Sequence, residues 1–452
     1  MNFISNIGYD TAFLALFAII GLTVILRFPQ AILYLLIPST ILPKYFNQVI
    51  TIGHVNIFVH DCFLFFYCAC AGVLILAKFI KKKQIFDLDS ATKPLFFLAS
   101  SYLLLHLFYV VISLVQGVSP ATAIRRFLIY SDILYFYFPI LFLSDESQYK
   151  NLLKFMIIMV IFGFLHQLYV AAIATRFHNL TSSGTVRIGL NGITIIGSCF
   201  FAFIVFKNDL KYYLIAICPI ISIILVGHRS GFIAIAASLI VFFIFTKKIT
   251  KLLLLCYLFG FLLLISLGGL EFLTGHDFLE DTLTRTGDTF STSNKTSIGR
   301  LNKIENSFQV FIKKPIFGFG HNYESIKGLA NKYPYGLNDQ EYLKDFEFNV
   351  LHPHCLLARS LSHTGIFGTL ILSSIIILAL KRCHLLIGAG ESYSTKGVFI
   401  YCSIIYFVVF SLFNTTFTEE GWFFWTLCGS VVYFSKNIES AVGNNVPEIN
   451  AI

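Results

Sequence analysis

Charged side chains are scarce in this sequence, because only 13% of its 452 residues are Asp, Glu, Lys or Arg, whereas 56% are hydrophobic. The mean hydropathy is correspondingly high, at +0.77. A soluble globular domain usually carries about 25% charged residues to cover its surface. The composition therefore excludes that class and indicates an integral membrane protein. The sequence also lacks a basic segment interleaved with aromatic residues on a polar face, which argues against a nucleic-acid partner.

Metal-ligand spacing is also missing from the ten cysteines. Several of them are scattered through apolar runs, and we interpret these as small core residues: Cys62, Cys68, Cys70, Cys199, Cys218 and Cys256. The first apolar run, TAFLALFAIIGLTVILRF, has neither a basic leader nor a small-residue cleavage site. We interpret it as a retained span rather than a signal peptide.

Long apolar runs recur along almost the whole chain. A helix needs about 20 apolar residues to cross a bilayer. The predicted spans are 11–27, 57–79, 95–115, 127–143, 152–174, 190–206, 211–226, 232–246, 251–268, 364–380, 397–414 and 421–434. A shorter run at 30–43 is a candidate partial or tilted span. The predicted fold class is therefore all-α, a polytopic membrane bundle of about 12 transmembrane helices with one large outer loop.

Short lysine-rich loops indicate which side of the membrane is cytoplasmic. The loops at 81–83, 207–211, 247–251 and 381–382 fall on one side when the spans alternate. The segments at 116–126, 175–189, 227–231, 269–351 and 415–420 then face outward, and the side of the N-terminus stays open. This divides the chain into N-terminal transmembrane helices at 1–268, an outer loop at 269–351, C-terminal transmembrane helices at 352–436 and a cytoplasmic tail at 437–452.

The large outer loop contains one amphipathic pattern. In RLNKIENSFQVFIKK, apolar residues such as Leu301, Ile304 and Phe308 recur at helical spacing, which predicts a helix on the membrane or on the spans. The pattern ends at Pro315, and GFGHNY follows as a turn. A lone Gly-x-Gly is compatible with phosphate binding, but it lacks a strand-then-helix context, so a packed glycine turn is the alternative.

Arginines gather on or near the outer face, against the usual positive-inside trend. The rigid donor fork of arginine matches phosphate oxygens two at a time and keeps its charge at ordinary pH. We interpret these arginines as a binding site for an anion. For any single arginine, the alternative is that its side chain snorkels to the lipid headgroups. The arginines are Arg125, Arg126, Arg176, Arg187, Arg229, Arg300 and Arg359.

Four stretches in this order resemble the O-antigen ligase and O-antigen polymerase superfamily. GHRSG is similar to the arginine-bearing helix entry of that family, with Arg229 at the arginine, and RRFLIY supplies an arginine pair before an earlier span. GRLNKIENSFQVFIKKPIFGFG resembles the family's arginine, amphipathic helix and Pro-x-x-Gly-x-Gly run. HCLLARSLSHTGIFGT fits its His, nine-residue, Gly-x-x-Gly pattern. Three positions depart from the family, which usually has serine at His228, an amide or serine at Cys355 and often a glutamate at His363.

The resemblance implies a membrane glycosyltransferase of the bacterial inner membrane, with its site on the periplasmic side and with neither metal nor cofactor. The implied donor is an undecaprenyl-diphosphate-linked glycan, and the acceptor is lipid A-core in a ligase or a second lipid-linked repeat in a polymerase. The His, nine-residue, Gly-x-x-Gly, Thr pattern favours the ligase. A lipid-linked glycan flippase is a further alternative, although the sequence shows neither paired halves nor charge along a central path.

Site roles follow from the resemblance together with side-chain chemistry. Neutralising the charge that develops on the diphosphate is work for arginines, and activating a hydroxyl is work for a histidine. We expect Arg125, Arg126, Arg229 and Arg300 to bind the diphosphate, with Arg229 also catalytic, and His354 to act as general base. The expected supporting residues are His352, Arg187, Arg359, Glu419 and Glu420.

Some members of this set have simpler interpretations. At about 100° per residue, Arg359 and His363 would face away from His354, and we expect His363 to be structural. Glu419 and Glu420 would orient His354 or, alternatively, form a solvated loop end. The Asp-Leu-Asp at 87–89 lies beside the lysines of 81–83 and is interpreted as a solvated cytoplasmic loop.

Overall fold

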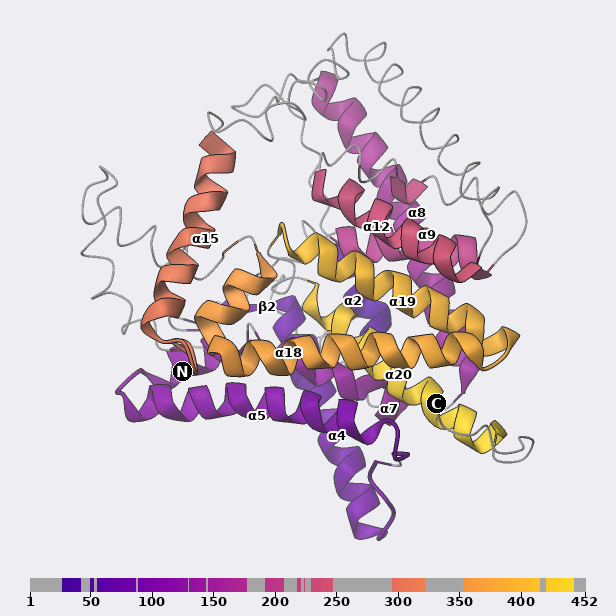
Figure 1. Cartoon of the computed structure of the whole chain (residues 1–452), viewed down its shortest axis with the longest axis horizontal. Coiled ribbons are helices and arrows are strands. Elements are labelled where there is room, and N and C mark those ends of the chain that lie inside the picture. The colour runs from indigo at the N-terminus through magenta and orange to yellow at the C-terminus, as the bar shows by residue number, and fades with distance from the viewer. Residues whose placement is uncertain are drawn as a thin grey trace, which may run out of the picture.

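The computed structural model describes residues 27–41, 49–52, 55–86, 88–128, 130–143, 145–176, 192–206, 218–220, 223, 229–246, 295–321, 353, 355–414 and 420–442. These residues form a helical bundle with one small hairpin (Figure 1). The helices of the first half are α2 (Ala31–Ile41), α4 (Val59–Ile80), α5 (Lys93–Val115), α6 (Pro120–Leu128), the 3₁₀ helix η1 (Ser131–Tyr137), α7 (Phe138–Phe142) and α8 (Glu146–Arg176). Those of the second half are α9 (Ile193–Phe206), α12 (Arg229–Thr246), α15 (Lys295–Lys313), α18 (Leu356–Gly388), α19 (Glu391–Ser411) and α20 (Gly421–Val442).

Five helices within the described residues are long and apolar enough to cross a membrane: α4, α5, α8, α18 and α19. Only 28–39% of the span residues of α4, α5, α8 and α18 are buried, compared with 67% in α19. The less buried helices therefore present apolar side chains outward, as lipid-facing helices do, and α19 is the central one. This confirms the helical membrane class. The prediction of about 12 spans extends beyond the described residues and stays a prediction.

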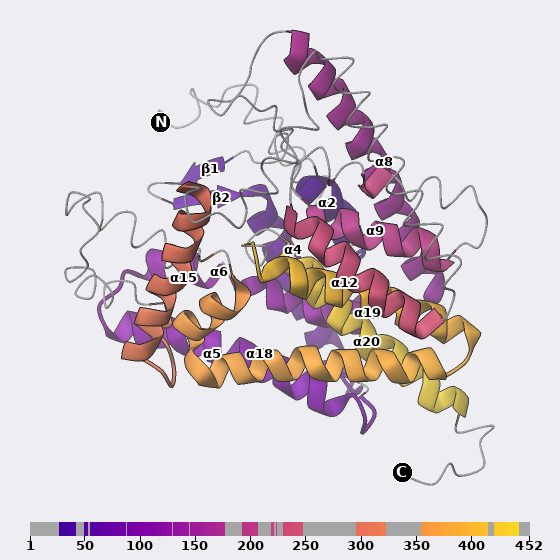
Figure 2. The same cartoon turned by 45° about the horizontal axis from the view of Figure 1, so that its top comes forward.

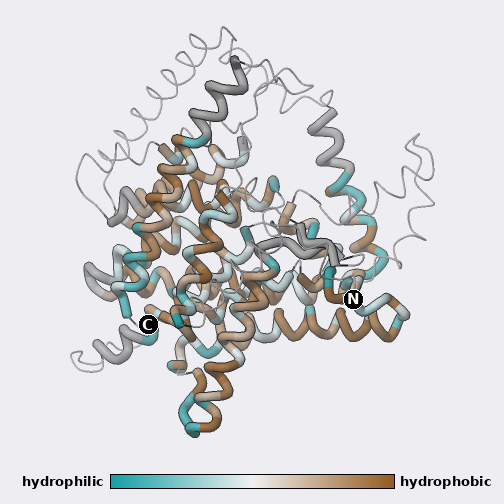
Figure 3. Tube along the Cα trace, turned by 180° about the vertical axis from the view of Figure 1, so that it is seen from behind, coloured by the Kyte–Doolittle hydropathy of each residue, from teal (hydrophilic) through white to brown (hydrophobic). Residues whose placement is uncertain are grey.

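Helix α18 packs against α19 on one side and α5 on another. Figures 1 and 2 show α5 and α18 running side by side along the long axis of the molecule. Helices α12 and α9 pack on α19, and α20 packs on η1 and α7. The long helices are mostly brown in Figure 3, whereas the coloured part of α15 alternates teal and brown, consistent with the predicted amphipathic helix.

Two local features differ from the sequence expectations. The predicted span at 127–143 is instead η1 followed by α7, together 12 residues from Ser131 to Phe142. Even with the longer rise of a 3₁₀ helix, they extend only about 20 Å, short of a bilayer core of about 30 Å. The second feature is an antiparallel hairpin of β1 (Val49–Ile52) and β2 (Val55–Phe58), which pairs Ile52 with Val55 just before α4.

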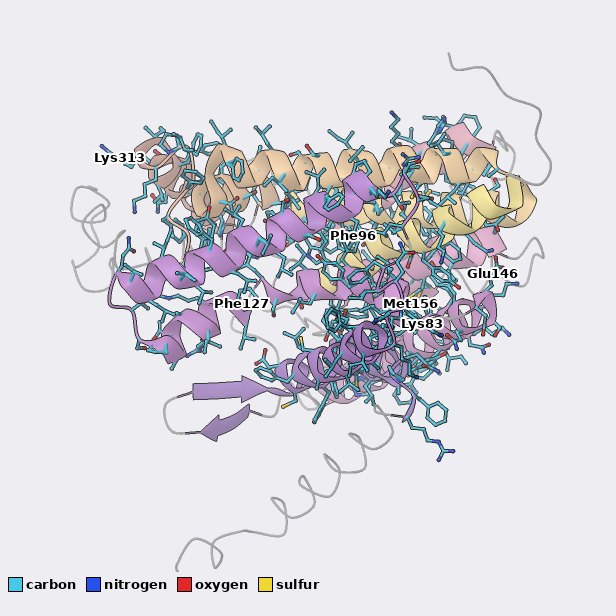
Figure 4. All side chains as sticks on the ribbon, turned by 90° about the horizontal axis from the view of Figure 1, so that it is seen from below. Lys83, Phe96, Phe127, Glu146, Met156 and Lys313 are labelled. Atoms are coloured by element: carbon cyan, nitrogen blue, oxygen red, sulfur yellow. The ribbon has the colours of Figure 1, made fainter. Side chains whose placement is uncertain are left out.

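The two ends of the bundle have different characters. Figure 4 shows Lys313 and Phe127 toward one end and Glu146 toward the other. At the Glu146 end, the ammonium group of Lys396 lies 2.6 Å from the Glu146 carboxylate, which joins the first turns of α8 and α19. At the Lys313 end, α5 ends, α6 follows, α15 ends and α18 begins. Two of the segments predicted to face outward, 116–126 and the described end of 269–351, therefore lie at this end.

Candidate functional site

The glycine turn after α15 docks on a kink in α18. Gly365 interrupts the helix with φ 64° and ψ −165°, a conformation that only glycine adopts readily. The freed amides of Ile366 and Phe367 donate to the carbonyls of Pro315 and Ile316, at 2.8 and 3.1 Å. In return, the amides of Phe319 and Gly320 donate to carbonyls of α18, at 3.0 and 2.9 Å. These two amides are occupied, which favours the packed-turn interpretation over a phosphate cradle.

Two side chains from the first half of the chain tether the same turn. The hydroxyl of Tyr109, in α5, donates to the carbonyl of Phe317 at 2.6 Å. The guanidinium of Arg126, in α6, donates to the carbonyl of His321 at 2.7 Å. The segments RRFLIY and PIFGFGH, which are about 190 residues apart in the sequence, therefore meet at the start of α18.

A buried polar cluster lies beneath this turn, centred on Tyr130. The Tyr130 ring stacks on His106, with ring centroids 4.2 Å apart, and lies 5.1 Å from the ring of His321. The Tyr130 hydroxyl is hydrogen-bonded to Nδ1 of His363. All three histidines are at most 2% exposed. Neither ring nitrogen of His106 has a hydrogen-bond partner within the described residues, an unusual state for a buried imidazole.

Burial determines the protonation states of the two cluster residues that lie outside the spans, His321 and Tyr130. It lowers the pKa of His321 to about 4, and the nearby charge of Arg126 acts in the same direction. Burial also raises the pKa of the Tyr130 hydroxyl. At neutral pH the cluster therefore contains a neutral His321 and a protonated Tyr130, and an arginine contributes a permanent positive charge.

That charge is on Arg359, in the first turns of α18. Its side chain is 4% exposed, and its guanidinium carbon lies 5.1 Å from the centre of the Tyr130 ring. Arg359 and His363 border a cavity of about 20 Å³. The other residues that line this cavity are Tyr102, Tyr130, Asp132, Leu356, Ser360, Thr364, Leu372 and Trp425. The start of α18 thus combines a buried cation with hydroxyl groups and aromatic rings.

The structure brings together part of the predicted site. Arg126 and Arg359 lie at this end, and Arg125 is exposed on α6. Arg229 begins α12 and Arg300 lies within α15, although their side chains are not among those described. His354, His352, Arg187 and Glu419 lie outside the described residues, so their placement stays a prediction.

Two sequence interpretations need correction. Cys355 has extended backbone angles, φ −158° and ψ 119°, and α18 begins only at Leu356. The helical-angle comparison with His354 therefore does not apply, because that comparison needs one continuous helix. Glu420 is not a solvated loop end, since it is 3% exposed and accepts the amides of Gly192 and Thr194 at 3.0 and 2.7 Å. Its carboxylate caps the start of α9, where negative charge is favoured.

A third interpretation concerned the acidic residues at 87–89. The carboxylate of Asp89 accepts the amide of Thr92 at 2.5 Å at the start of α5, so it serves as a local cap rather than as a freely solvated group. Asp87 lies outside the described residues.

Sequence reasoning missed Tyr130, His106 and His321 as site residues. His106 stands inside the predicted span 95–115, and an ionisable residue within a span is a functional candidate by default. That signal was available. Tyr130 ends the quoted RRFLIY and His321 ends PIFGFGH, but nothing local marks either of them.

Comparison with known families identifies one matching family. Residues 214–373 match the family model described as Wzy_C, O-antigen ligase. The match spans α12, α15, the docked turn and the first half of α18. It confirms the resemblance to the O-antigen ligase and O-antigen polymerase superfamily and gives no support to a flippase. No curated protein matches the chain.

Proposed function

We propose that this chain, a member of the O-antigen ligase and polymerase superfamily over residues 214–373, is an O-antigen ligase of the bacterial inner membrane. In this proposal it transfers a glycan from undecaprenyl diphosphate to lipid A-core on the periplasmic side. The observation that carries the proposal is the meeting of α6, the docked turn and the start of α18 at one end of an apolar bundle. An active site at a bundle end can receive a membrane-bound donor and a water-exposed acceptor together.

The reaction needs one bond made and one broken. The acceptor hydroxyl oxygen attacks the anomeric carbon of the donor sugar, and the bond from that carbon to the diphosphate oxygen breaks. The electron pair leaves with the diphosphate, and the hydroxyl proton passes to a base. We assign the base to His354, because an imidazole has its ordinary pKa near 6.5 and accepts a proton at neutral pH.

Charge neutralisation of the leaving diphosphate falls to arginines. We assign this role to Arg229, Arg300, Arg125 and Arg126. Arg126 is the member for which a contact supports the assignment, since its guanidinium already bridges α6 to the docked turn. The planar donor fork of arginine suits phosphate oxygens. The proposed mechanism requires neither metal nor cofactor.

A transfer assay with purified protein in detergent tests the proposal. The substrates are an undecaprenyl-diphosphate-linked glycan, with lipid A-core either added or omitted. We expect product only when core is present, and a loss of at least a hundredfold in His354→Ala and Arg229→Ala. His384→Ala and Arg382→Ala, at the far end of α18, are matched controls that should retain activity.

The outcomes separate the competing functions. Ladders of polymerised repeats formed without core would establish the polymerase instead. Full activity in both site variants would reject the assigned roles. An absence of any glycan transfer by wild-type protein would reject the enzyme proposal itself.

A further inference from the structure

Helix α15 exposes apolar side chains and buries polar ones. The buried residues in its described part are Asn306, Ser307 and Val310, of which two are polar. Phe308 and Ile312, which are one helical turn apart on another side of the helix, are instead exposed, Ile312 by 68%. A helix that packed on protein alone would bury its apolar side. This arrangement therefore indicates an apolar environment outside the chain.

The exposed apolar surface continues through the docked turn onto α18. Ile316 and Phe317 are 63% and 51% exposed. The Phe317 ring meets the ring of Phe367 edge-on, with ring centroids 5.7 Å apart. Phe367 and Leu370 are exposed residues of α18, a span of which only 28% is buried. We define the outer apolar face as Phe308, Ile312, Ile316, Phe317, Phe367 and Leu370.

Helix α15 crosses the direction of the neighbouring spans. Figures 1 and 2 both show α5 and α18 running side by side, with α15 running across them at one end. Since spans run through the bilayer, a helix that crosses them lies along its surface. An amphipathic helix in that position buries its apolar side about 5–10 Å into the boundary between headgroups and acyl chains. Because the outer apolar face is continuous with the lipid-facing side of α18, the bilayer is the occupant that fits it.

The charges beside the outer apolar face complement anionic lipid. Lys313 and Lys314 directly follow Ile312, and Figure 4 shows Lys313 at the outer edge of the molecule. Residues 303–321 contain three lysines and a single acidic residue, Glu305. A lysine can lay its stem along apolar surface while its ammonium group reaches the phosphate oxygens of headgroups. The turn end of α15 therefore pairs an apolar surface with the sign of charge that anionic headgroups attract.

We propose that the outer apolar face is a membrane-docking surface. It seats α15 and the docked turn in one leaflet of the bilayer, with Lys313 and Lys314 paired to the phosphates of anionic lipids. This docking does not depend on the proposed function. Its consequence for catalysis does rest on that function: Arg300, in the same helix, is held at headgroup level, where the diphosphate of a membrane-bound donor lies.

Tryptophan fluorescence of the full chain in lipid nanodiscs tests the docking. Both native tryptophans, Trp422 and Trp425, are buried, so a tryptophan introduced at the surface adds a signal that can be separated from wild type. Lipids that carry bromine on the acyl chain near the headgroup quench a tryptophan that touches them. Loss of the added emission therefore reports contact between the substituted position and lipid.

Substitutions on the outer apolar face are compared with two controls. We expect Ile312→Trp and Phe317→Trp to lose their added emission as fully as Leu370→Trp, which lies on the lipid-facing span α18. Gln84→Trp, in the exposed segment after α4, is the matched control and should keep its added emission. Size-exclusion chromatography and thermal unfolding show that each variant is folded.

Mixed lipids measure the contribution of the lysines. The discs contain phosphatidylglycerol and phosphatidylcholine together, and either one or the other carries the bromine. Each lysine should favour the anionic lipid about fivefold, so Phe317→Trp should be quenched more strongly by brominated phosphatidylglycerol. Adding Lys313→Gln and Lys314→Gln should abolish this preference, whereas adding Lys381→Gln, at the other end of α18, should leave it unchanged.

The outcomes separate docking from its alternatives. Unquenched emission in Ile312→Trp and Phe317→Trp, while Leu370→Trp is quenched, would overturn the docking surface and leave a second copy or another protein as the occupant. Equal quenching by the two brominated lipids would reject the pairing of the lysines with anionic headgroups. Quenching without any glycan transfer would uphold the docking and reject the proposed function, so the two failures are distinguishable.

Discussion

Replacing Gly365 with alanine should release the docked turn from α18. The backbone angles at Gly365, φ 64° and ψ −165°, lie in a region that costs a non-glycine residue about 1–3 kcal/mol. A Cβ atom there would also lie 2.3 Å from the carbonyl oxygen of Ile316 and 2.6 Å from the amide nitrogen of Gly318. Both contacts are with backbone, so no side-chain rotation relieves them.

Relief requires the turn to move away from the helix. That movement breaks the backbone hydrogen bonds between residues 315–320 and α18, each worth about 1 kcal/mol. Since the strain and the two backbone clashes exist only in the docked state, we expect that state to lose about 3 kcal/mol relative to the open one. Since about 1.4 kcal/mol corresponds to a factor of ten, the turn should open at least about a hundredfold more often.

Hydrogen exchange measures this opening directly. The amides of Phe319 and Gly320 are bonded to α18 and should exchange at least about a hundredfold faster in Gly365→Ala than in wild type. Gly388→Ala is the matched control, because it lies in the same helix and its added Cβ meets nothing within 4 Å. Unchanged protection at both amides in Gly365→Ala would refute the reasoning.

Three further predictions concern ionisable side chains and their effect on stability. Glu146→Gln removes the carboxylate that pairs with Lys396, whose side chain is 3% exposed, and should destabilise the protein by about 3 kcal/mol. Lys396→Met should cost less, because the Glu146 side chain left behind is 36% exposed. Chemical unfolding of both variants checks this order. Glu420→Gln removes the charge of the carboxylate that accepts the amides of Gly192 and Thr194 at the start of α9. The free energy of unfolding should fall by about 2 kcal/mol, measured in the same way. Burial lowers the pKa of His321 to about 4 from about 6.5, so the unfolded chain binds a proton at a higher pH than the folded chain does. The free energy of unfolding should therefore fall by about 3 kcal/mol as the pH drops from about 6.5 to about 4. His321→Phe should lose this part of the acid sensitivity when unfolding is measured from pH 7 to pH 4.

The length of the apolar runs predicted the long helices well, but it did not predict short helices or a 3₁₀ helix. The run at 95–115 became α5 at Lys93–Val115, because 20 or more apolar residues in a row have few alternatives to a helix in lipid. The run at 127–143 has the same composition but contains Pro139 and a 3₁₀ stretch, which hydropathy does not detect. The hairpin was not predicted, because hydropathy does not distinguish a strand from a helix in a short apolar run, although VITI and VNIF are rich in β-branched residues that favour strands.

The cluster at the start of α18 was predictable only in part. Arginines and histidines in apolar surroundings indicated RRFLIY and the start of α18 as parts of the site. The family resemblance related these segments to one another. Their partners come from four places in the chain, and no local pattern links Tyr130 to His363 or Tyr109 to Phe317. Such contacts depend on how α5, α6 and the docked turn pack together, which is information that a single sequence does not display.

The membrane environment explains why this cluster has the form it does. An ionisable residue within a span costs about 2.5–3.5 kcal/mol on insertion scales, so each needs a partner or a role. His363 has a partner in the Tyr130 hydroxyl, and the charge of Arg359 faces the same ring. Arg359 also interacts with the Tyr130 hydroxyl, yet a methionine or leucine would fill the same position without the cost of burying a charge. A purely structural role therefore accounts for His363 more easily than for Arg359.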